Sequence, residues 1–141
     1  MASSKSTLRI PAAIDQIRRA VLFVATSSQR MGMGTDGAHQ VQIAVEEIIT
    51  NIVEHGYRAD PQSAVIDIAV EREGQQVIIT ITDDAPLFNP LLNTEPDPHT
   101  PLEDRKTGGW GVYFVKQYVD AVHYRAASNR NQITLIKKIA N

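Results

Sequence analysis

The sequence contains no cysteine, which excludes disulfide bridges and metal sites built on thiolates. It also lacks long apolar runs. Stretches such as "AVLFVA" at residues 20–25 are far shorter than the roughly 20 residues that cross a membrane, and the start "MASSKSTLRI" lacks the apolar core of a signal peptide. We therefore expect a cytoplasmic protein with no membrane partner, and a cysteine-free secreted protein stays open as the alternative.

An excess of basic charge is missing too. The chain has 14 lysines and arginines against 16 aspartates and glutamates, with a pI of about 6.1. Domains that bind nucleic acid usually carry a basic patch and a high pI, so we expect no nucleic-acid partner. The 43% hydrophobic and 21% charged residues are typical of a globular protein, and 141 residues predict a single domain over residues 1–141.

Hydrophobic spacing predicts the order of the secondary-structure elements. A short strand at residues 7–10 is followed by a helix within residues 11–31, with Pro11 in its first turn. A second helix runs from about residue 37 to 55, with Asp36 as its cap. The apolar stripe predicted for the first helix comprises Ile14, Ile17, Val21, Val24 and Ala25.

The second half of the chain predicts two hairpins. The segments "AVIDIAVERE" and "QQVIITITDD" pair around a turn at "EGQQ", a third helix follows "GGWG", and a last hairpin turns near residues 129–131. The order (β)αα-ββ-loop-α-ββ predicts an α+β fold. We expect a two-layer α/β sandwich in which a mostly antiparallel sheet carries helices on one face.

The second helix contains the stretch "AVEEIITNIVEHGY", residues 44–57. Its apolar residues share one side, and Glu47 and Asn51 lie one turn apart on the other, with Thr50 and Glu54. Glu46 points about 100° away from Glu47. An amide oxygen and a carboxylate one turn apart can hold Mg²⁺ and orient a hydroxyl, although a solvated helix face has the same pattern.

A second candidate site lies at the end of the strand in "IITITDDAPLFNP", residues 78–90. Asp83 and Asp84 end the strand before a break at Ala85 and Pro86. A carboxylate there can accept a hydrogen bond from an exocyclic amine such as that of adenine, which gives selectivity when the site is buried. An ordinary strand end is the alternative.

The segment from residue 86 to 107 contains five of the seven prolines and has no periodicity. Loops longer than about 12 to 15 residues are usually lids, binding loops or disordered segments. Directly after it, "TGGWG" places glycines at a helix start, where backbone N–H groups attract phosphate, or forms a flexible join. The candidate phosphate contacts are Arg105, Lys106, Gly108, Gly109 and Gly111.

Three other signals do not predict a site. "GMGTDG" at residues 32–37 matches G-x-G-x-x-G, but it follows a helical pattern instead of the strand that a dinucleotide motif requires. The sequence has no P-loop motif. The four histidines show no metal-ligand spacing.

In this order, the helix, the acidic strand end, the long loop and the glycine turn resemble the GHKL (Bergerat, histidine-kinase-like) ATPase fold. The closer resemblance is to its branch of anti-sigma-factor serine/threonine kinases. "EIITNIVEHGY" is similar to the N box of that branch, "DDAPLFNP" to its D-D-G-P-P-F-D-P segment, and "GGWGVYFVKQYVD" to its G-G-x-G-x-x-x-[VI] segment. The resemblance extends from about Ile10 to the C-terminus.

The resemblance implies a role for each matching residue. Asn51 would coordinate Mg²⁺ at the nucleotide phosphates, Glu47 would be the general base, and Asp83 would bind the adenine amine. Residues 86–107 would form the ATP lid, the three glycines would contact phosphates, and Arg105 or Lys106 would neutralise transition-state charge. Ala85 and Asn89 depart from the family pattern, which has Gly and Asp there, and the Ala85 methyl group is expected to weaken ATP binding or tilt the base.

The function implied is that of an ATP- and Mg²⁺-dependent serine/threonine kinase that phosphorylates an anti-anti-sigma (STAS-type) partner and sequesters a sigma factor, with a homodimer as the expected assembly. One alternative is a nucleotide-binding partner-switch protein without kinase activity. The catalytic domain of a histidine kinase is less expected, because 141 residues leave no room for a phospho-acceptor helix pair. A plain interaction domain is the last alternative.

Overall fold

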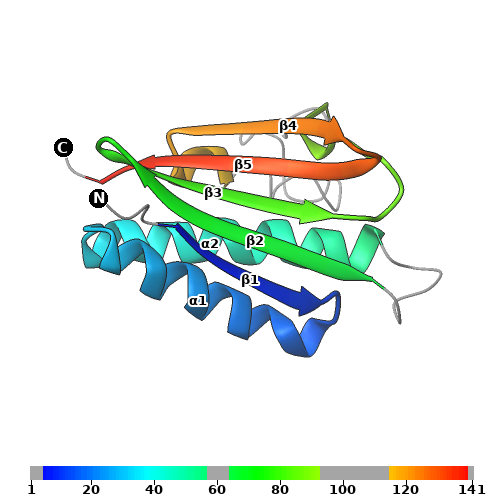
Figure 1. Cartoon of the computed structure of the whole chain (residues 1–141), viewed down its shortest axis with the longest axis horizontal. Coiled ribbons are helices and arrows are strands. Elements are labelled where there is room, and N and C mark those ends of the chain that lie inside the picture. The colour runs from blue at the N-terminus through cyan, green and yellow to red at the C-terminus, as the bar shows by residue number, and fades with distance from the viewer. Residues whose placement is uncertain (1–4, 57–63, 93–114, 140–141) are drawn as a thin grey trace, which may run out of the picture.

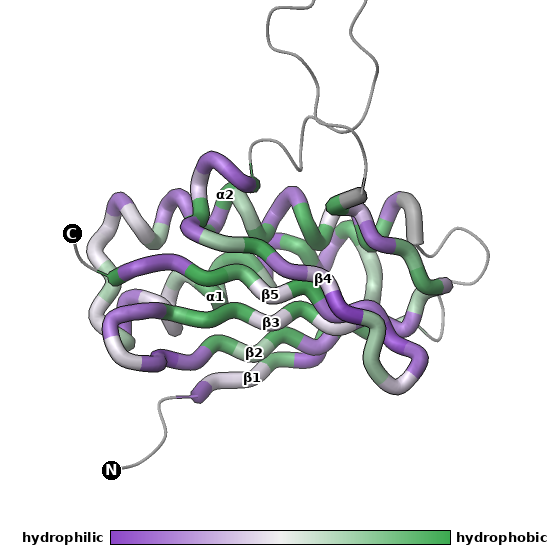
Figure 2. The backbone as a smooth tube through the Cα atoms, turned by 90° about the horizontal axis from the view of Figure 1, so that it is seen from above, coloured by the Kyte–Doolittle hydropathy of each residue, from purple (hydrophilic) through white to green (hydrophobic). Residues whose placement is uncertain are grey.

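The computed structural model describes residues 5–56, 64–92 and 115–139. Its strands form one antiparallel sheet in the order β1-β2-β3-β5-β4. Figure 2 shows this order across the sheet, with hydrophobic and polar segments alternating along the strands. The strands are β1 (Lys5–Pro11), β2 (Val65–Glu73), β3 (Gln76–Asp83), β4 (Ala121–Ala127) and β5 (Arg130–Lys138).

Two long helices lie side by side on one face of the sheet (Figure 1). They are α1 (Ile17–Arg30), preceded by the 3₁₀ turn η1 (Ile14–Gln16), and α2 (Thr35–Asn51), which continues as the π-helical turn η2 (Ile52–Gly56). A 3₁₀ turn, η3 (Pro90–Leu92), follows β3, and residues 115–118 are helical before β4. The predicted two-layer α+β fold with helices on one face is confirmed.

The core lies between the sheet and the two helices. Alternate residues of each inner strand point to the helices because side chains alternate along a strand, and full burial of each Val or Ile contributes roughly 1.5–3 kcal/mol. The α2 stripe predicted from the sequence is buried, with Val53 at its margin. The core residues from the sheet and α2 are Ile66, Ile68, Val70, Val77, Ile79, Ile81, Ile133, Leu135, Val41, Ala44, Val45, Ile48, Ile49 and Ile52.

The start of the first helix was predicted wrongly. Pro11 is the last residue of β1, opposite Val65, instead of lying in the first helical turn. Proline is tolerated there because β1 is an edge strand, in which a missing N–H need not break the sheet. The chain therefore turns after residue 11, and Ile14 lies outside the core with 67% of its surface exposed.

The connection between the helices explains the false dinucleotide motif. Gly32, with φ of 106°, ends α1, and the N–H of Met33 bonds to the carbonyl of Ser28 at 3.0 Å, as in a Schellman motif. Gly34 is the N-cap of α2 and makes no side-chain cap bond. Asp36 lies inside the first turn, so the prediction that it caps the helix is wrong.

Both hairpins form, and the last one turns slightly earlier than predicted. Ser128 and Asn129 have φ of 53° and 60° and form the turn, which leaves Asn131 inside β5. Two adjacent positive φ values are typical of the tight turns that connect antiparallel strands. None of the helices described in residues 5–56, 64–92 and 115–139 is long and apolar enough to cross a membrane.

Candidate functional site

Asp83 is a buried carboxylate at the end of β3, with 3% of its surface exposed. Its Oδ1 accepts two hydrogen bonds, from the backbone N–H of Ala85 at 2.9 Å and from Nδ2 of Asn131 at 3.0 Å. Burial raises the pKa of Asp83 above its usual value, and these two bonds partly oppose the shift. A carboxylate held in this way is positioned to accept a further hydrogen bond.

Asn131 lies opposite Asp83 in the β3–β5 register and is 5% exposed. Besides Asp83, its Nδ2 lies 3.2 Å from the carbonyl oxygens of Ala85 and Pro86. Its Oδ1 accepts from the N–H of Phe88 at 3.0 Å and from the hydroxyl of Tyr124 at 2.6 Å. The amide therefore connects the end of β3, the segment that follows it, and β4.

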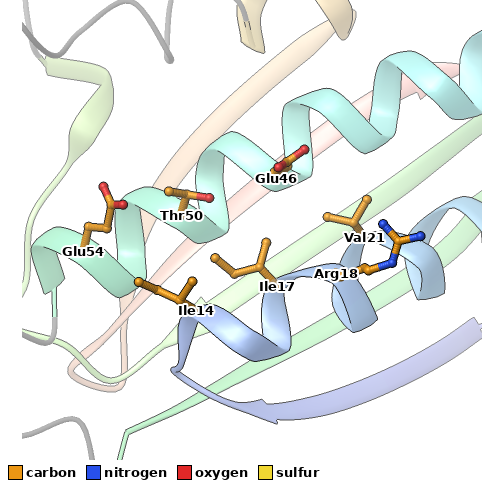
Figure 3. A pocket seen from close by; sticks show the side chains of 7 residues that line it. All are labelled: Ile14, Ile17, Arg18, Val21, Glu46, Thr50 and Glu54. Atoms are coloured by element: carbon orange, nitrogen blue, oxygen red, sulfur yellow. The ribbon is translucent and has the colours of Figure 1, made fainter.

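Glu47 and Asn51, the candidates on α2, are both half-buried. The exposed Glu46 lies elsewhere, in a groove of about 350 Å³ between α1 and α2 (Figure 3). Thr50 and Glu54 line this groove too, so they lie with Glu46 and not, as predicted, with Glu47 and Asn51. The groove is lined by Ile14, Ile17, Arg18, Val21, Glu46, Thr50 and Glu54.

The Asp83 site at the end of β3 and the Glu47–Asn51 pair of α2 lie at the same end of the molecule. In Figure 1 the C-terminal end of α2 lies at the end of the sheet toward which β3 runs. Because Asn51 ends α2 and Asp83 ends β3, the elements bring both to this end. The α1–α2 groove and a second groove of about 360 Å³ between β1 and α1 are lined by neither Asp83 nor Asn51.

Several predicted site residues fall in residues 93–114, outside the described part of the chain. These are Arg105, Lys106, Gly108, Gly109 and Gly111, together with most of the predicted lid at residues 86–107. Of that lid the structure describes residues 86–92, where Oδ1 of Asn89 accepts the N–H of Leu91 at 2.9 Å and so supports η3.

Ala85, which departs from the family pattern, is 4% exposed and belongs to the hydrophobic core. Its φ is not positive, since the non-glycine residues with positive φ in the described chain are Ser128 and Asn129. This backbone conformation therefore does not itself require glycine. The methyl group is accommodated by packing inside the protein.

Among the described residues, no group of three or more His, Cys, Asp or Glu side chains could hold a metal. The donors at the end of α2 are instead one amide and one carboxylate. Such hard oxygen donors suit Mg²⁺, which usually keeps several waters and binds through one or two protein ligands together with substrate phosphates. The amide oxygen of Asn51 therefore fits a cation that arrives with a nucleotide.

Asn131 and its partner Tyr124 were not predicted as site residues. The sequence feature that could have indicated Asn131 is its place in β5, at an inward position in line with the buried residues Ile133 and Leu135. A buried amide among apolar neighbours requires hydrogen-bond partners. Its partners come from β4 and from the segment after β3, which sequence spacing alone does not bring together.

Comparison with protein families identifies the family to which this fold belongs. The model of the histidine kinase-like ATPase domain matches residues 10–137. The chain belongs to the histidine kinase-like ATPase family. This match confirms the resemblance to the GHKL fold that the N box, the acidic strand end and the glycine turn indicated.

Relatives of this GHKL chain include serine-protein kinases. The serine-protein kinase RsbW of Oceanobacillus iheyensis is 28% identical over 119 residues, which cover 82% of this chain and 75% of that protein. The serine-protein kinase RsbW of Bacillus mycoides is 26% identical over 122 residues, covering 84% of this chain and 75% of that protein. These similarities confirm the predicted branch of the family.

Solved structures share the fold. The RsbU and RsbW domains of Rv1364c from Mycobacterium tuberculosis match with a TM-score of 0.66 and 19% identity. That match covers 96% of this GHKL chain and 33% of the solved one, so the chain spans about a third of that protein's structure. The catalytic domain of histidine kinase ThkA matches with a TM-score of 0.53 and 11% identity, over 95% of this chain and 96% of that one.

Proposed function

We propose that this protein is an ATP- and Mg²⁺-dependent serine/threonine kinase that acts as an anti-sigma regulatory factor. The observation that carries the proposal is the buried Asp83 carboxylate at the end of β3, at the same end of the molecule as Glu47 and Asn51 of α2. Membership of the GHKL family and similarity to proteins named serine-protein kinase RsbW support it.

Asp83 would recognise the base. An ionised carboxylate offers about four lone-pair sites on two oxygens, and the two bonds from Ala85 and Asn131 both end on Oδ1. The exocyclic amine of adenine would donate to the remaining acceptor capacity. Guanine has a carbonyl at the equivalent position, so a carboxylate here favours adenine.

Glu47 would accept the proton of the attacking serine or threonine hydroxyl, and Asn51 one turn later would hold Mg²⁺ through its amide oxygen. When bound, Mg²⁺ supplies neutralisation of the phosphate charge, which together with positioning accounts for most catalysis of phosphoryl transfer. We also propose that Gly108, Gly109 and Gly111 contact the phosphates, that residues 86–107 form the lid, and that Arg105 or Lys106 assists there.

The similarity to proteins named serine-protein kinase RsbW also supports our proposal for the partners. The phosphorylated protein would be a STAS-type anti-anti-sigma factor, and the sequestered one a sigma factor. A homodimer is the proposed assembly, and residues 1–141 are proposed to form one domain. Because the Ala85 methyl group packs in the core, it is proposed to weaken nucleotide binding relative to a glycine only by shifting the neighbouring Asp83 carboxylate, which the Ala85 N–H contacts.

The test is a phosphorylation assay with the full chain, radiolabelled ATP, Mg²⁺ and the STAS-type protein encoded by a neighbouring gene. We expect label on a serine or threonine of that partner, and we expect calorimetric titration to detect ATP binding. ATP binding without transfer would replace the kinase by a nucleotide-binding partner-switch protein. Failure to bind ATP at millimolar concentration would overturn the proposed function altogether.

A further inference from the structure

Asn131 forms an unusually complete set of contacts for a residue outside the predicted motifs. A side-chain amide has two N–H donors and one acceptor oxygen with two lone pairs. In this protein the two donors are shared among three oxygens, on Asp83, Ala85 and Pro86. The oxygen accepts two hydrogens, from Phe88 and Tyr124. Every hydrogen-bonding group of this 5% exposed side chain is therefore used.

These contacts fix two things at once. The first is the rotation of the Asp83 carboxylate, because the bonds from Asn131 and Ala85 both hold Oδ1 and leave Oδ2 on the other side. The second is the backbone of residues 85–88, which Asn131 holds through two carbonyls and one N–H. Because that backbone leads directly into the predicted lid, one side chain connects the base-recognising group to the root of the lid.

We infer that Asn131 is the positioning residue of the nucleotide site, which presents Asp83 to the base and couples it to the backbone of residues 85–88. The inference rests on the proposed function, since it assigns Asp83 to adenine. Tyr124 supports it from β4 by donating to the amide oxygen, and the N–H of Phe88, which can only donate, fixes the flip of the amide and so directs Nδ2 toward Asp83.

The substitution Asn131→Asp tests the role of the amide N–H groups separately from that of the amide oxygen. It keeps an oxygen for Phe88 and Tyr124 but replaces the donor by a second carboxylate next to Asp83. Two carboxylates at hydrogen-bond distance share one proton, because both cannot ionise without strong repulsion. At high pH the two carboxylates repel each other, and the Asp83 side chain is no longer held in place. At low pH a shared proton restores a hydrogen bond between them. A residue that only filled space would give no such dependence on pH.

The matched control is Gln132→Glu. It makes the same change from amide to acid on the neighbouring residue of β5, whose side chain points to the opposite face of the sheet. Calorimetric titration with ATP and GTP, at pH 8 and pH 5.5, gives the affinity and the preference for adenine. Hydrogen exchange of the Ala85 and Phe88 N–H groups, followed by NMR without nucleotide, reports the backbone.

We expect Asn131→Asp to bind ATP about 10-fold to 100-fold more weakly than wild type at pH 8, the loss typical of a hydrogen bond to a charged group. The preference of Asn131→Asp for ATP over GTP should be smaller than that of wild type. The difference in ATP affinity between the variant and wild type should be smaller at pH 5.5 than at pH 8. The N–H of Ala85 should exchange faster in the variant. Gln132→Glu should match wild type in all of these. Wild-type affinity and preference in folded Asn131→Asp at both pH values would overturn the inference and leave the proposed function standing.

Two other outcomes stay informative. If the wild-type chain binds no ATP, the proposed function fails. In that case, unchanged amide exchange in Asn131→Asp overturns the positioning role as well, whereas faster exchange supports the role of Asn131 in holding the backbone of residues 85–88. If Asn131→Asp does not fold, Tyr124→Phe removes the 2.6 Å bond to Oδ1 alone. About threefold to tenfold weaker ATP binding supports the inference, and wild-type affinity overturns it.

Discussion

Glu46 and Glu47 are adjacent in the sequence but face different surroundings on α2. Glu46 is exposed and lines the groove between α1 and α2, whereas Glu47 is half-buried and does not line that groove. The difference follows from helix geometry, because consecutive residues are separated by about 100° around the axis. Asn51 shares the side of Glu47, and Thr50 shares the side of Glu46.

The first prediction concerns these two glutamates. Glu47→Gln should leave ATP affinity within about threefold of wild type and lower the rate of transfer to the STAS-type partner by about 100-fold to 10,000-fold, because it removes the general base. Single-turnover transfer from radiolabelled ATP measures the rate. Glu46→Gln is the matched control and should bind ATP and transfer phosphate as wild type does when the partner is saturating. An inactive Glu46→Gln with an active Glu47→Gln would show that the wrong glutamate was assigned.

The second prediction concerns the cation. Asn51→Ala should remove most of the Mg²⁺ dependence of ATP binding, because the amide oxygen at the end of α2 is lost. Titrations with and without Mg²⁺ measure this dependence. Thr50→Ala, on the neighbouring position that faces the α1–α2 groove, should keep the Mg²⁺ dependence of wild type. Equal Mg²⁺ dependence in Asn51→Ala and wild type would remove Asn51 from the site.

The third prediction separates stability from function at Asp83. Asparagine at this position keeps an oxygen for Ala85 and Asn131 and removes a charge that burial disfavours, so Asp83→Asn should be at least as stable as wild type at pH 7. The raised pKa of Asp83 means that its stabilising contribution is present at low pH and is lost as pH rises through that pKa. In urea unfolding experiments, the free energy of unfolding of Asp83→Asn relative to wild type should therefore increase from pH 4 toward neutral pH.

The same variant should bind ATP at least about tenfold more weakly and lose its preference over GTP, because an amide can turn either a donor or an acceptor to the base. Calorimetric titration with both nucleotides measures the two effects. Reduced stability at pH 7 together with unchanged ATP affinity would indicate that Asp83 is a structural residue.

The fold was largely predictable because its elements have strong local signals. The alternation in β2 and β3 and the apolar stripe of α2 each follow one period over several turns or residue pairs, and tertiary packing agrees with them. The start of α1 was not predictable in this way. Pro11 is acceptable both in a first helical turn and at the end of an edge strand, and only the pairing with Val65 decides between them.

The candidate site was predictable as separate motifs, and its connections were not. Asp83 and the Glu47–Asn51 pair stand out in the sequence because each is a polar signal at the end of an apolar element. Asn131 lies 48 residues after Asp83, and their bond depends on the pairing of β3 with β5. No local pattern reports that pairing, so the residue that organises the site was found only in three dimensions.

The fourth prediction concerns the exposed face of the sheet, where Asp67 lies between two arginines. Its Oδ1 accepts from Arg9 at 2.6 Å, and Nη2 of Arg130 reaches across β3 to Oδ2 at 2.8 Å. The hydrogen bond from Arg9 holds the pKa of Asp67 below its usual value, with Arg130 adding to the effect. A lowered pKa stabilises the fold above the pKa of the unfolded chain, and this contribution is lost as pH falls through the folded value.

Asp67→Asn should therefore lower the free energy of unfolding by up to about 1 kcal/mol at pH 7, a small effect because the group is partly exposed. The difference from wild type should shrink as pH falls below about 4 and should also shrink in high salt. Urea unfolding across this pH range measures it, with Glu73→Gln at the exposed end of β2 as the control. A difference that stays constant from pH 7 to pH 2 would contradict an electrostatic origin.

The last prediction concerns Gly32, which ends α1 with φ of 106°. A Cβ at this position would lie 2.9 Å from Nη1 of Arg72, and that group donates a 2.7 Å bond to the carbonyl of Met31. Gly32→Ala should therefore cost about 2–3 kcal/mol, from backbone strain and a displaced arginine together. Gly74 is the reference, because its φ of 62° lies in the allowed left-handed region and no atom lies within 4 Å of a Cβ there, and Gly74→Ala should cost about 1 kcal/mol. Urea unfolding of both variants measures the difference, and equal losses would show that neither the φ of 106° nor the contact with Arg72 adds to the ordinary cost of a left-handed alanine.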